Sequence, residues 1–267
     1  MLTKLQIQKT LRENGVKLGD HLMVHSSLKS VGPIDGGPSA FIEALSEALG
    51  AKGTLAMPAY NYSRPLPSPY FDISKTPGRT GALTEIFRQQ PGTLRSLHPT
   101  HSVLARGLRA SEFLVDHRKT LTFGIGSPID RLMQAGGYVL LVGVSQLANS
   151  SIHVGQSYAG ARKFFWEDGA PPVAKILMSD GKIEEHQLDC SATCSMAFNS
   201  MEYPLRRNGF VSDLIFGQAL CFLMKGKDVI DTTVQLLREE PRLLLCTRES
   251  CRPCRLARQY IDSKASN

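Results

Sequence analysis

The sequence contains no segment suited to a membrane. No apolar run in its 267 residues approaches the ~18 residues that a membrane-spanning helix needs. The first 15 residues place charges within an apolar pattern typical of a helix. They lack the continuous apolar stretch and the small-residue cleavage site of a signal peptide. We therefore expect a cytoplasmic protein with no membrane partner.

Features of nucleic-acid-binding proteins are also scarce. Aromatic residues make up only 7% of the chain, and no nucleic-acid-binding motif occurs. The formal net charge is +7, but the basic residues are spread along the chain, apart from a group near its end: Arg248, Arg252, Arg255 and Arg258. Spread basicity favours an anionic small ligand, or general solubility, over nucleic acid as a partner.

Cysteine is missing from the first two-thirds of the chain. The six cysteines all lie in the last third: Cys190, Cys194, Cys221, Cys246, Cys251 and Cys254. Cys251 and Cys254 form a C-x-x-C motif, so a thiolate zinc site built from four of the six is one reading. A second C-x-x-C and the surroundings of a thioredoxin motif are both absent. We therefore expect reduced, partly buried thiols and no metal.

The most informative stretch runs over residues 22–37. A short apolar strand at 22–24 ends at His25, Ser26 and Ser27, and a glycine-bearing turn and a helix with apolar residues at helical spacing follow. An α/β fold presents polar groups at the carboxyl end of its sheet in this way. An imidazole, hydroxyls and free N–H groups there suit an anionic cofactor or a reacting centre. The alternative is a βα turn with a buried, hydrogen-bonded histidine.

A second strand repeats this arrangement. Residues 137–144, GYVLLVGV, form the strongest strand pattern in the chain, typical of a central buried strand. A polar loop follows and leads to His153 at the start of a helix. Two such strand ends in one sheet can face one site; otherwise His153 is a solvent-exposed residue at a helix start.

The rest of the chain indicates one α/β domain over residues 1–267. We expect a mixed central sheet flanked by helices in a core at 1–165, a smaller C-terminal part at 166–245 and a Cys/Arg-rich tail at 246–267. Residues 173–188 alternate around a Ser-Asp-Gly turn and predict a β-hairpin. Residues 60–80 form a long loop rich in proline, serine and tyrosine, and such loops tend to be functional. Gly53 leads into a strand in TLAMPAY (54–60), and we expect Pro58 to end it.

Several segments together resemble the aminoglycoside 3-N-acetyltransferase family, antibiotic acetyltransferases distinct from the GNAT fold. The matching segments, in order, are VHSSLKSVGPIDGG (24–37), GTLAMPAYNY (53–62), FDISKTPGRTGALTEIFR (71–88), LRSLHPTHSVLARG (94–107), GIGSPIDRL (124–132), VLLVGVSQLANSSIHVGQ (139–156) and GFVSDLIFGQAL (209–220). The resemblance implies the antibiotic-acetyltransferase type of α/β fold, and a transferase that moves acetyl from acetyl-CoA to an amine, as in antibiotic resistance. Its partners would be acetyl-CoA and a small-molecule amine, in a monomer or homodimer.

The resemblance also implies roles for individual residues. His153 would be the general base, with His25 and Ser26 near the thioester. An imidazole suits that task because its pKa lies near neutrality and an ammonium must lose a proton before it attacks. The cofactor side would hold Ser26, Ser27, Leu28, Lys29, Ser30, Val31, Gly32 and Thr76. The acceptor side would hold Tyr60, Asp72, Glu85, His98, Asn149 and Gln156.

Two departures from the family pattern bear on the acceptor. Gln156 stands where the family commonly has a glutamate, and Asn149 stands where some relatives have an acidic residue. Fewer carboxylates and a net basic chain disfavour a polycationic aminoglycoside. Glu167 and Asp168, besides Asp72 and Glu85, are candidates to restore negative charge. A less cationic amine, such as a nucleotide-linked amino sugar or another small metabolite, is therefore the alternative acceptor.

Two hypotheses with a different function also remain. One is the same fold with another acyl donor or an oxygen acceptor. The other is a protein that holds CoA without turnover, which the changes at Gln156 and Asn149 would suit.

Overall fold

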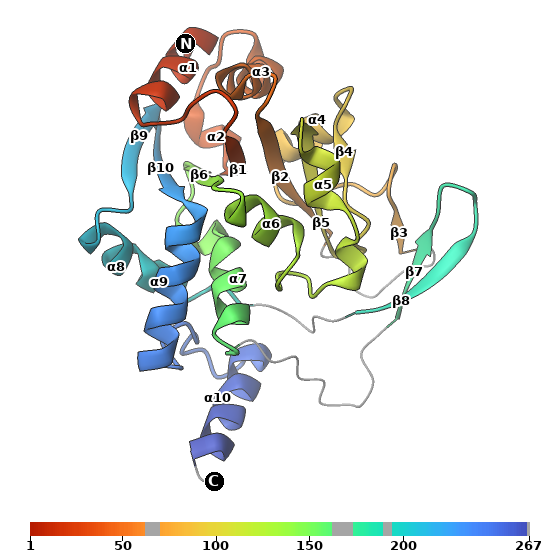
Figure 1. Cartoon of the computed structure of the whole chain (residues 1–267), viewed down its shortest axis with the longest axis vertical. Helices are drawn as coiled ribbons and strands as arrows, with labels where there is room; N and C mark the ends of the chain where they lie inside the picture. The colour runs from red at the N-terminus through yellow and green to blue at the C-terminus, as the bar shows by residue number, and fades with distance from the viewer. Residues whose placement is uncertain (62–69, 162–172, 189–193, 266–267) are drawn as a thin grey trace.

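A mixed seven-stranded sheet forms the centre of the molecule in this computed structural model, which describes residues 1–61, 70–161, 173–188 and 194–265 (Figure 1). The strand order is β4-β5-β2-β1-β6-β10-β9. The strands are β1 (His21–Ser26), β2 (Thr54–Tyr60), β4 (Leu94–Arg95), β5 (His101–Gly107), β6 (Tyr138–Val142), β9 (Ser212–Phe216) and β10 (Ala219–Lys225). The predicted mixed α/β fold with helices around a central sheet is confirmed.

The three central strands, β2, β1 and β6, run parallel. Strand β5 pairs antiparallel with β2, and β10 pairs antiparallel with β6. The edge strands β4 and β9 pair antiparallel with β5 and β10. Every residue of β2 is buried, as are all but the first residue of β6. Long apolar runs of this kind are typical of parallel strands covered on both faces. The carboxyl ends of β1, β2 and β6 therefore lie at one edge of the sheet.

The pairing of β1 differs on its two sides. With β6 it continues through Ser26, opposite Val142, but with β2 it stops at Met23, opposite Ala56. Pro58 therefore does not end β2 as the sequence predicted. Beyond Ala56, strand β2 pairs only with β5. Proline has no backbone N–H to donate, but at position 58 there is no β1 residue that would need this hydrogen bond. The carboxyl ends of β1 and β2 are unpaired with each other.

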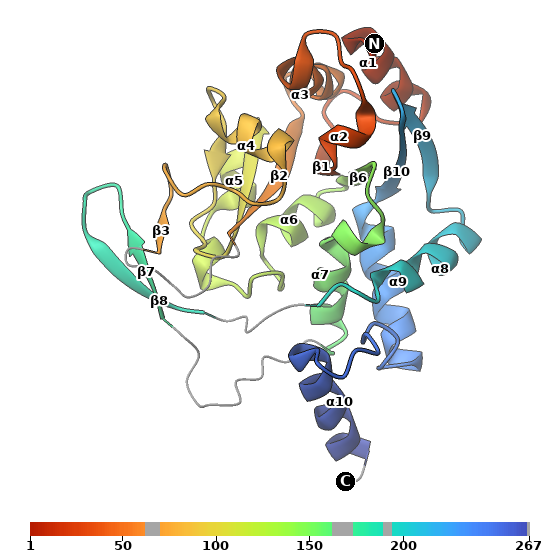
Figure 2. The ribbon, with the colours of Figure 1, turned by 180° about the vertical axis from the view of Figure 1, so that it is seen from behind.

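Helices cover both faces of the sheet (Figures 1 and 2). Alternating strand residues point to opposite faces, so Val24 belongs to one core and Met23 to the other. Three helices close the Val24 face: α1 (Lys4–Glu13), α3 (Gly37–Leu49) and α4 (Ala82–Gln89). The Met23 face is covered by α5 (Ala110–Leu114), α6 (Pro128–Gln134), α7 (Ser151–Tyr158) and α9 (Gly226–Glu239).

Short elements complete the architecture. The four-residue helix α2 (Leu28–Val31) follows β1, and the 3-10 turns are η1 (His117–Lys119), η2 (Gln146–Ala148) and η3 (Phe198–Met201). Helix α8 (Glu202–Arg207) follows η3, and α10 (Arg252–Ala265) ends the described chain. In Figures 1 and 2, α10 extends away from the sheet at the lower end of the molecule.

The predicted hairpin at 173–188 is confirmed, and it forms part of a separate small sheet. Strands β7 (Val173–Leu177) and β8 (Ile183–Gln187) pair antiparallel, and β3 (Phe71–Asp72) pairs parallel with β7. These three strands lie at the side of the molecule in Figure 1. A small hydrophobic cluster that includes Phe71 and Ile176 packs within this part of the fold. The small sheet thus joins part of the 60–80 loop to the C-terminal half of the chain.

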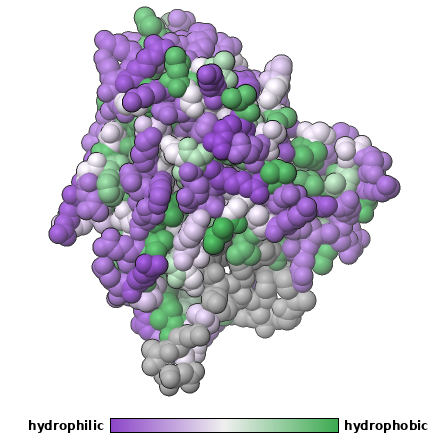
Figure 3. All heavy atoms as spheres, viewed as in Figure 1, coloured by the Kyte–Doolittle hydropathy of each residue, from purple (hydrophilic) through white to green (hydrophobic). Residues whose placement is uncertain are grey.

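The sequence did not predict β9, β10 or α10. Strand β10 pairs with β6 along five residues and brings Cys221 into the main core. The C-terminal part therefore adds two strands to the same sheet as β1. None of the described helices is both long and apolar enough to cross a membrane. The face shown in Figure 3 is largely hydrophilic, with hydrophobic residues scattered in small groups among the described atoms.

Helices α7 and α9 pack closely through Gly155. A Cβ atom there would lie 2.5 Å from the Thr233 Cβ and 3.0 Å from the Ile230 carbonyl oxygen. In an open helix, Gly→Ala stabilises by up to about 1 kcal/mol. We expect Gly155→Ala instead to lower the free energy of unfolding by roughly 1–3 kcal/mol, because the helices must move apart. Denaturant unfolding measures this, with Ser157→Ala on the same helix as the control. A Gly155→Ala protein as stable as the wild type would contradict the close approach.

Candidate active site

A cavity of about 490 Å³ lies at the carboxyl ends of β1 and β2, where the two strands are not paired with each other. Strand β1 contributes His25 and Ser26, and α7 contributes His153. The remaining lining residues are Pro58, Tyr60, Arg79, Thr80, Gly81, His101, Phe123, Val144, Leu147, Ala148, Asn149, Ser150, Ser195 and Phe198. The two histidines that the sequence singled out thus line one cavity.

Strand periodicity explains why His25 and His153 line the same cavity. His25 is two residues beyond Met23, so its side chain projects to the face that α7 covers. Strand β6 pairs with β1 over the whole length of β6. The loop that follows β6 leads to α7 and so begins beside the end of β1. Just before α7, the Asn149 side chain accepts a hydrogen bond from the Ser151 N–H at 3.2 Å and so stabilises the turn into the helix. His153 therefore lies in the first turn of a helix at the sheet edge.

Packing and one hydrogen bond fix the His153 ring. The imidazole stacks on Phe123 with 4.9 Å between ring centroids and meets the edge of Phe198 at 4.6 Å. Its Nδ1 atom lies 2.8 Å from the Gln156 Oε1 atom, one helical turn along α7. With the amide oxygen as acceptor, Nδ1 carries the proton and Nε2 carries the basic lone pair. The neutral amide sets this tautomer without adding a charge.

His25 is held in a different environment. Its side chain is 5% exposed, and its Nε2 atom has no hydrogen-bond partner within the part of the chain that the structure describes. Burial lowers the pKa of His25 to about 4, so the ring is neutral at pH 7. A neutral imidazole at the cavity wall can form one further hydrogen bond there without a charge. The hydroxyl-bearing Ser26 lies beside it.

The predicted cofactor segment forms the turn after β1. Ser26 reaches the cavity, whereas residues 27–32 form α2 and its flanks next to it. The Ser27 N–H donates to the Val142 carbonyl at 2.9 Å, and the Ser30 hydroxyl donates to the Ser27 hydroxyl at 3.0 Å. Thr76 stabilises a loop elsewhere, since its hydroxyl accepts the Asp72 N–H at 2.8 Å, and it is not among the cavity residues.

The predicted acceptor residues fall into two groups. Tyr60 and Asn149 line the cavity, and the Tyr60 hydroxyl donates to the Ser150 hydroxyl at 2.7 Å. Gln156 acts on the cavity through His153. The structure does not bring the other three acceptor residues, which are Asp72, Glu85 and His98, to the cavity lining.

Those three residues have local partners. The Asp72 carboxylate accepts from Ser74 at 2.6 Å, and Glu85 pairs with Arg88 at 2.6 Å. Hydrogen bonds from Ser74 hold the pKa of Asp72 below its usual value. His98 is fully buried, and its Nδ1 atom accepts the His101 N–H at 3.1 Å. It therefore supports a residue of the cavity wall rather than forming it.

Sequence reasoning missed several residues of the cavity. His101 lies in the HPTHS segment that carried part of the resemblance, yet only His98 of that segment was assigned a role. Its ring packs on Tyr60 at 4.9 Å and on Phe123 at 5.1 Å. Arg79 comes from the KTPGRTG segment, and its backbone N–H donates to the Tyr60 carbonyl at 2.8 Å. Phe198 had no recognisable signal, because it comes from an unpatterned segment.

The charge of the cavity wall is unusual for a polyamine site. Among the described lining residues there is no aspartate or glutamate, and Arg79 is the charged side chain. Glu167 and Asp168, which were candidates for negative charge, lie outside the described residues. The described wall is therefore neutral to basic.

Comparison with known proteins gives a consistent result. The sequence profile of the family described as "Aminoglycoside 3-N-acetyltransferase" matches residues 23–238. Aminoglycoside N(3)-acetyltransferase IV from Salmonella sp is 30% identical over 244 residues, covering 91% of this chain and 90% of the relative. The prophage-derived aminoglycoside N(3')-acetyltransferase-like protein YokD from Bacillus subtilis (strain 168) is 31% identical over 196 residues, covering 65% and 71% of the two chains.

A solved structure extends the comparison to the fold. A mutant of aminoglycoside acetyltransferase AAC(3)-IVa, crystallised in complex with gentamicin, superposes with a TM-score of 0.83 at 30% sequence identity. The match covers 97% of each chain. The likeness therefore includes the C-terminal strands and the tail as well as the sheet core.

The His153–Gln156 contact makes a direct prediction. In Gln156→Glu a carboxylate would accept the Nδ1 hydrogen bond and stabilise the imidazolium. We expect the NMR titration midpoint of the His153 ring to be higher in Gln156→Glu than in the wild-type protein. Gln156→Ala, which removes the acceptor without adding a charge, is the matched control and should show no such rise. Equal midpoints in Gln156→Glu and wild type would show that the contact does not form in solution.

Proposed function

Because the chain belongs to the aminoglycoside 3-N-acetyltransferase family, which consists of acyltransferases, we propose that it transfers acetyl from acetyl-CoA to an amino group of an aminoglycoside or related amino sugar. The observation that carries this proposal is the placement of His153. Its ring is held by Gln156 and two phenylalanines in a cavity that also contains His25 and Ser26.

His153 is the general base in this proposal. An ammonium group has no lone pair and cannot attack a thioester, so the acceptor reacts as the neutral amine, which loses one proton as the C–N bond forms. The proton moves to Nε2 of His153, while Nδ1–H stays bonded to Gln156. Because Phe123 and Phe198 restrict rotation of the ring, the base is positioned before the substrate binds.

Ser26 and His25, at the end of β1, bind and polarise the acyl donor in this proposal. Attack of the nitrogen on the carbonyl carbon forms the C–N bond and places negative charge on the thioester oxygen. The Ser26 hydroxyl and the neutral His25 ring are the polar groups at this wall that can donate a hydrogen bond to that oxygen. The C–S bond then breaks, and the CoA thiolate leaves and takes up the proton that His153 accepted. Acceptor and donor react directly in a ternary complex, so no acetylated side chain is required.

One observation favours a second acceptor class within the same reaction. A polycation binds best where carboxylates surround it, yet the described cavity wall carries Arg79 and no acidic residue. A less cationic amine, for example a nucleotide-linked amino sugar, fits this wall better. The chemistry at His153 is the same for both classes.

The role of His153 has a direct kinetic test. We expect His153→Ala to lower kcat by roughly 10²–10⁴-fold, the usual contribution of a positioned general base. CoA affinity, measured by calorimetry, should be largely unchanged because CoA is assigned to the β1 side of the cavity. His21→Asn is the matched control: His21 begins β1, at the end remote from the cavity, and should leave kcat unchanged. Turnover by His153→Ala above a tenth of wild type would reject His153 as the base.

The acceptor class is tested with a panel of amines. The panel contains aminoglycosides, nucleotide-linked amino sugars and simple amino acids, and CoA thiol release is followed against a no-acceptor control. Under the aminoglycoside proposal, Arg79→Glu should raise kcat/KM for aminoglycosides by roughly fivefold or more at low salt. Arg238→Glu makes the same change in net charge on the exposed surface of α9, away from the cavity, and is the control.

Each outcome of the panel is informative. Aminoglycoside turnover that responds to Arg79→Glu but not to Arg238→Glu supports the first acceptor class. Turnover only with less cationic amines, reduced by Arg79→Glu, supports the second. CoA binding without turnover on any amine would reject both acceptor proposals in favour of a CoA-binding protein.

A further inference from the structure

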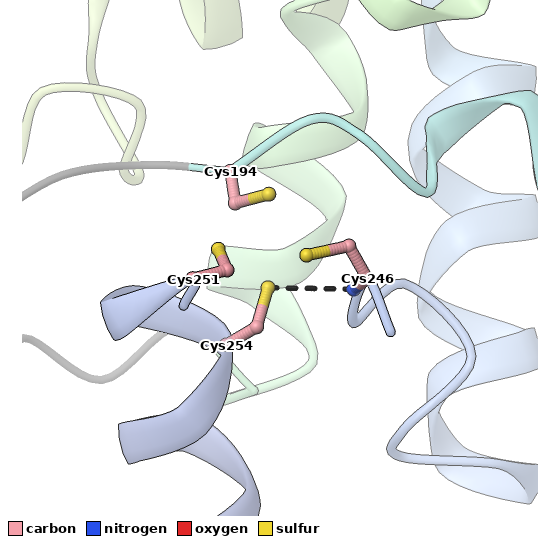
Figure 4. Close-up of side chains that lie close together, drawn as sticks. All are labelled: Cys194, Cys246, Cys251 and Cys254. Carbon is pink, nitrogen blue, oxygen red and sulfur yellow. Dashed lines mark hydrogen bonds between the residues drawn. The ribbon is translucent and has the colours of Figure 1, made fainter. Parts of the chain in front are cut away.

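Four cysteines from three separate segments meet at one point, outside the proposed active site (Figure 4). They are Cys194, Cys246, Cys251 and Cys254, and their sulfur atoms all lie within 4.8 Å of one another. Cys194 precedes η3, Cys246 follows α9, and Cys251 and Cys254 lie at the start of α10. Figure 4 shows the four side chains converging on a common centre from these segments.

The spacing of the sulfur atoms fits a single tetrahedral ion. Four thiolates bound to zinc at about 2.3 Å lie roughly 3.8 Å apart, the edge of the corresponding tetrahedron. The observed cluster needs only a small contraction to reach that arrangement. An iron–sulfur cluster would need wider spacing, because its iron and sulfide atoms separate the cysteine ligands.

Hydrogen bonds around the cluster hold the cysteines in place. The Cys246 N–H donates to the Cys254 sulfur at 3.4 Å, a contact that favours a thiolate. Arg258 donates through Nη1 to the Cys246 carbonyl at 2.7 Å, which ties the turn after α9 to α10. The Arg255 N–H donates to the Cys251 carbonyl at 2.9 Å. Such outer contacts orient the ligands of metal sites.

The local charge also suits a tetrathiolate. Four thiolates and one divalent ion carry a net charge of about −2. The arginines that stood out in the sequence lie in the same segments: Arg248, Arg252, Arg255 and Arg258. The amino-terminal end of α10 adds the positive end of a helix dipole next to Cys251. The tail therefore supplies compensating positive charge.

We propose that Cys194, Cys246, Cys251 and Cys254 bind one Zn²⁺ ion as a closed structural site. All four ligands come from the protein and leave no position for water or substrate, which is typical of structural rather than catalytic zinc. The sequence favoured unliganded thiols because the pair Cys246 and Cys194 does not form a second C-x-x-C. Three-dimensional folding supplies these two ligands from separate segments.

The site lies next to the wall of the proposed active site. Cys194 is followed directly by Ser195, which lines the cavity, and Phe198 contacts the His153 ring. The ion would tie this segment to α10 and so hold Phe198 in place. Metal binding and its effect on stability do not depend on the proposed function.

The first experiment measures metal in the wild-type protein. The full chain, purified without chelators, should contain about one zinc per chain by elemental analysis. Metal-free protein reconstituted with Co²⁺ should show the intense visible absorption of a tetrahedral tetrathiolate site. Neither result needs a variant, so a misfolded variant cannot obscure the answer. Absence of zinc together with failure to bind Co²⁺ would overturn the proposal, as would stoichiometric disulfides or iron in the cluster.

Variants then test the ligand set. Cys194→Ser and Cys254→Ser should each lower zinc content to below roughly a fifth of wild type after dialysis against a mild chelator. Cys221→Ser is the matched control, because Cys221 is buried in β10 and is not part of the cluster. Zinc removal should lower the Tm of wild type and Cys221→Ser but not that of the two ligand variants. Full zinc retention by Cys194→Ser would show that the four-cysteine site is wrong.

Discussion

The site depends on how β1 is paired. On one side its ladder with β6 continues through Ser26, and on the other its ladder with β2 ends at Met23. The first pairing holds His25 and Ser26 at a rigid strand end beside the loop that leads to His153. The second leaves the ends of β1 and β2 unpaired, and the cavity lies there. Pro58 is compatible with this arrangement because no β1 backbone group opposes it.

Within the cavity, packing rather than charge orients the proposed base. Two phenylalanine rings and the Gln156 amide fix the His153 imidazole, and His25 is kept neutral by burial. A carboxylate in place of Gln156 would couple the base to a negative charge and would also attract cationic acceptors. The neutral amide of Gln156 still orients the His153 ring, but it does not attract cationic acceptors. Arg79 at the cavity wall likewise disfavours a cationic acceptor.

The C-terminal third of the chain contributes more to the site than its sequence suggests. Strands β9 and β10 extend the sheet beside β6, and α9 packs against α7 through Gly155. The segment with Ser195 and Phe198 closes the cavity, and the cysteine cluster joins this segment to α10. Residues distant in sequence thus support one histidine ring from several directions.

The sequence by itself determined the features that depend on local order. Apolar periodicity predicted the central strand at 137–144 and the hairpin at 173–188. The sequence also identified His25 at the end of one strand and His153 at the start of the helix after another. Ordered motifs gave the family.

Tertiary structure alone decided which side chains meet. Asp72, Glu85 and His98 lie in matching motifs yet have local partners away from the cavity, whereas His101, Arg79 and Phe198 line it. The same holds for Cys194 and Cys246, whose positions in the chain give no signal that they meet the C-x-x-C pair Cys251 and Cys254. The physical reason is that strand register, helix packing and loop closure set distances between residues far apart in sequence, and a linear pattern does not encode them.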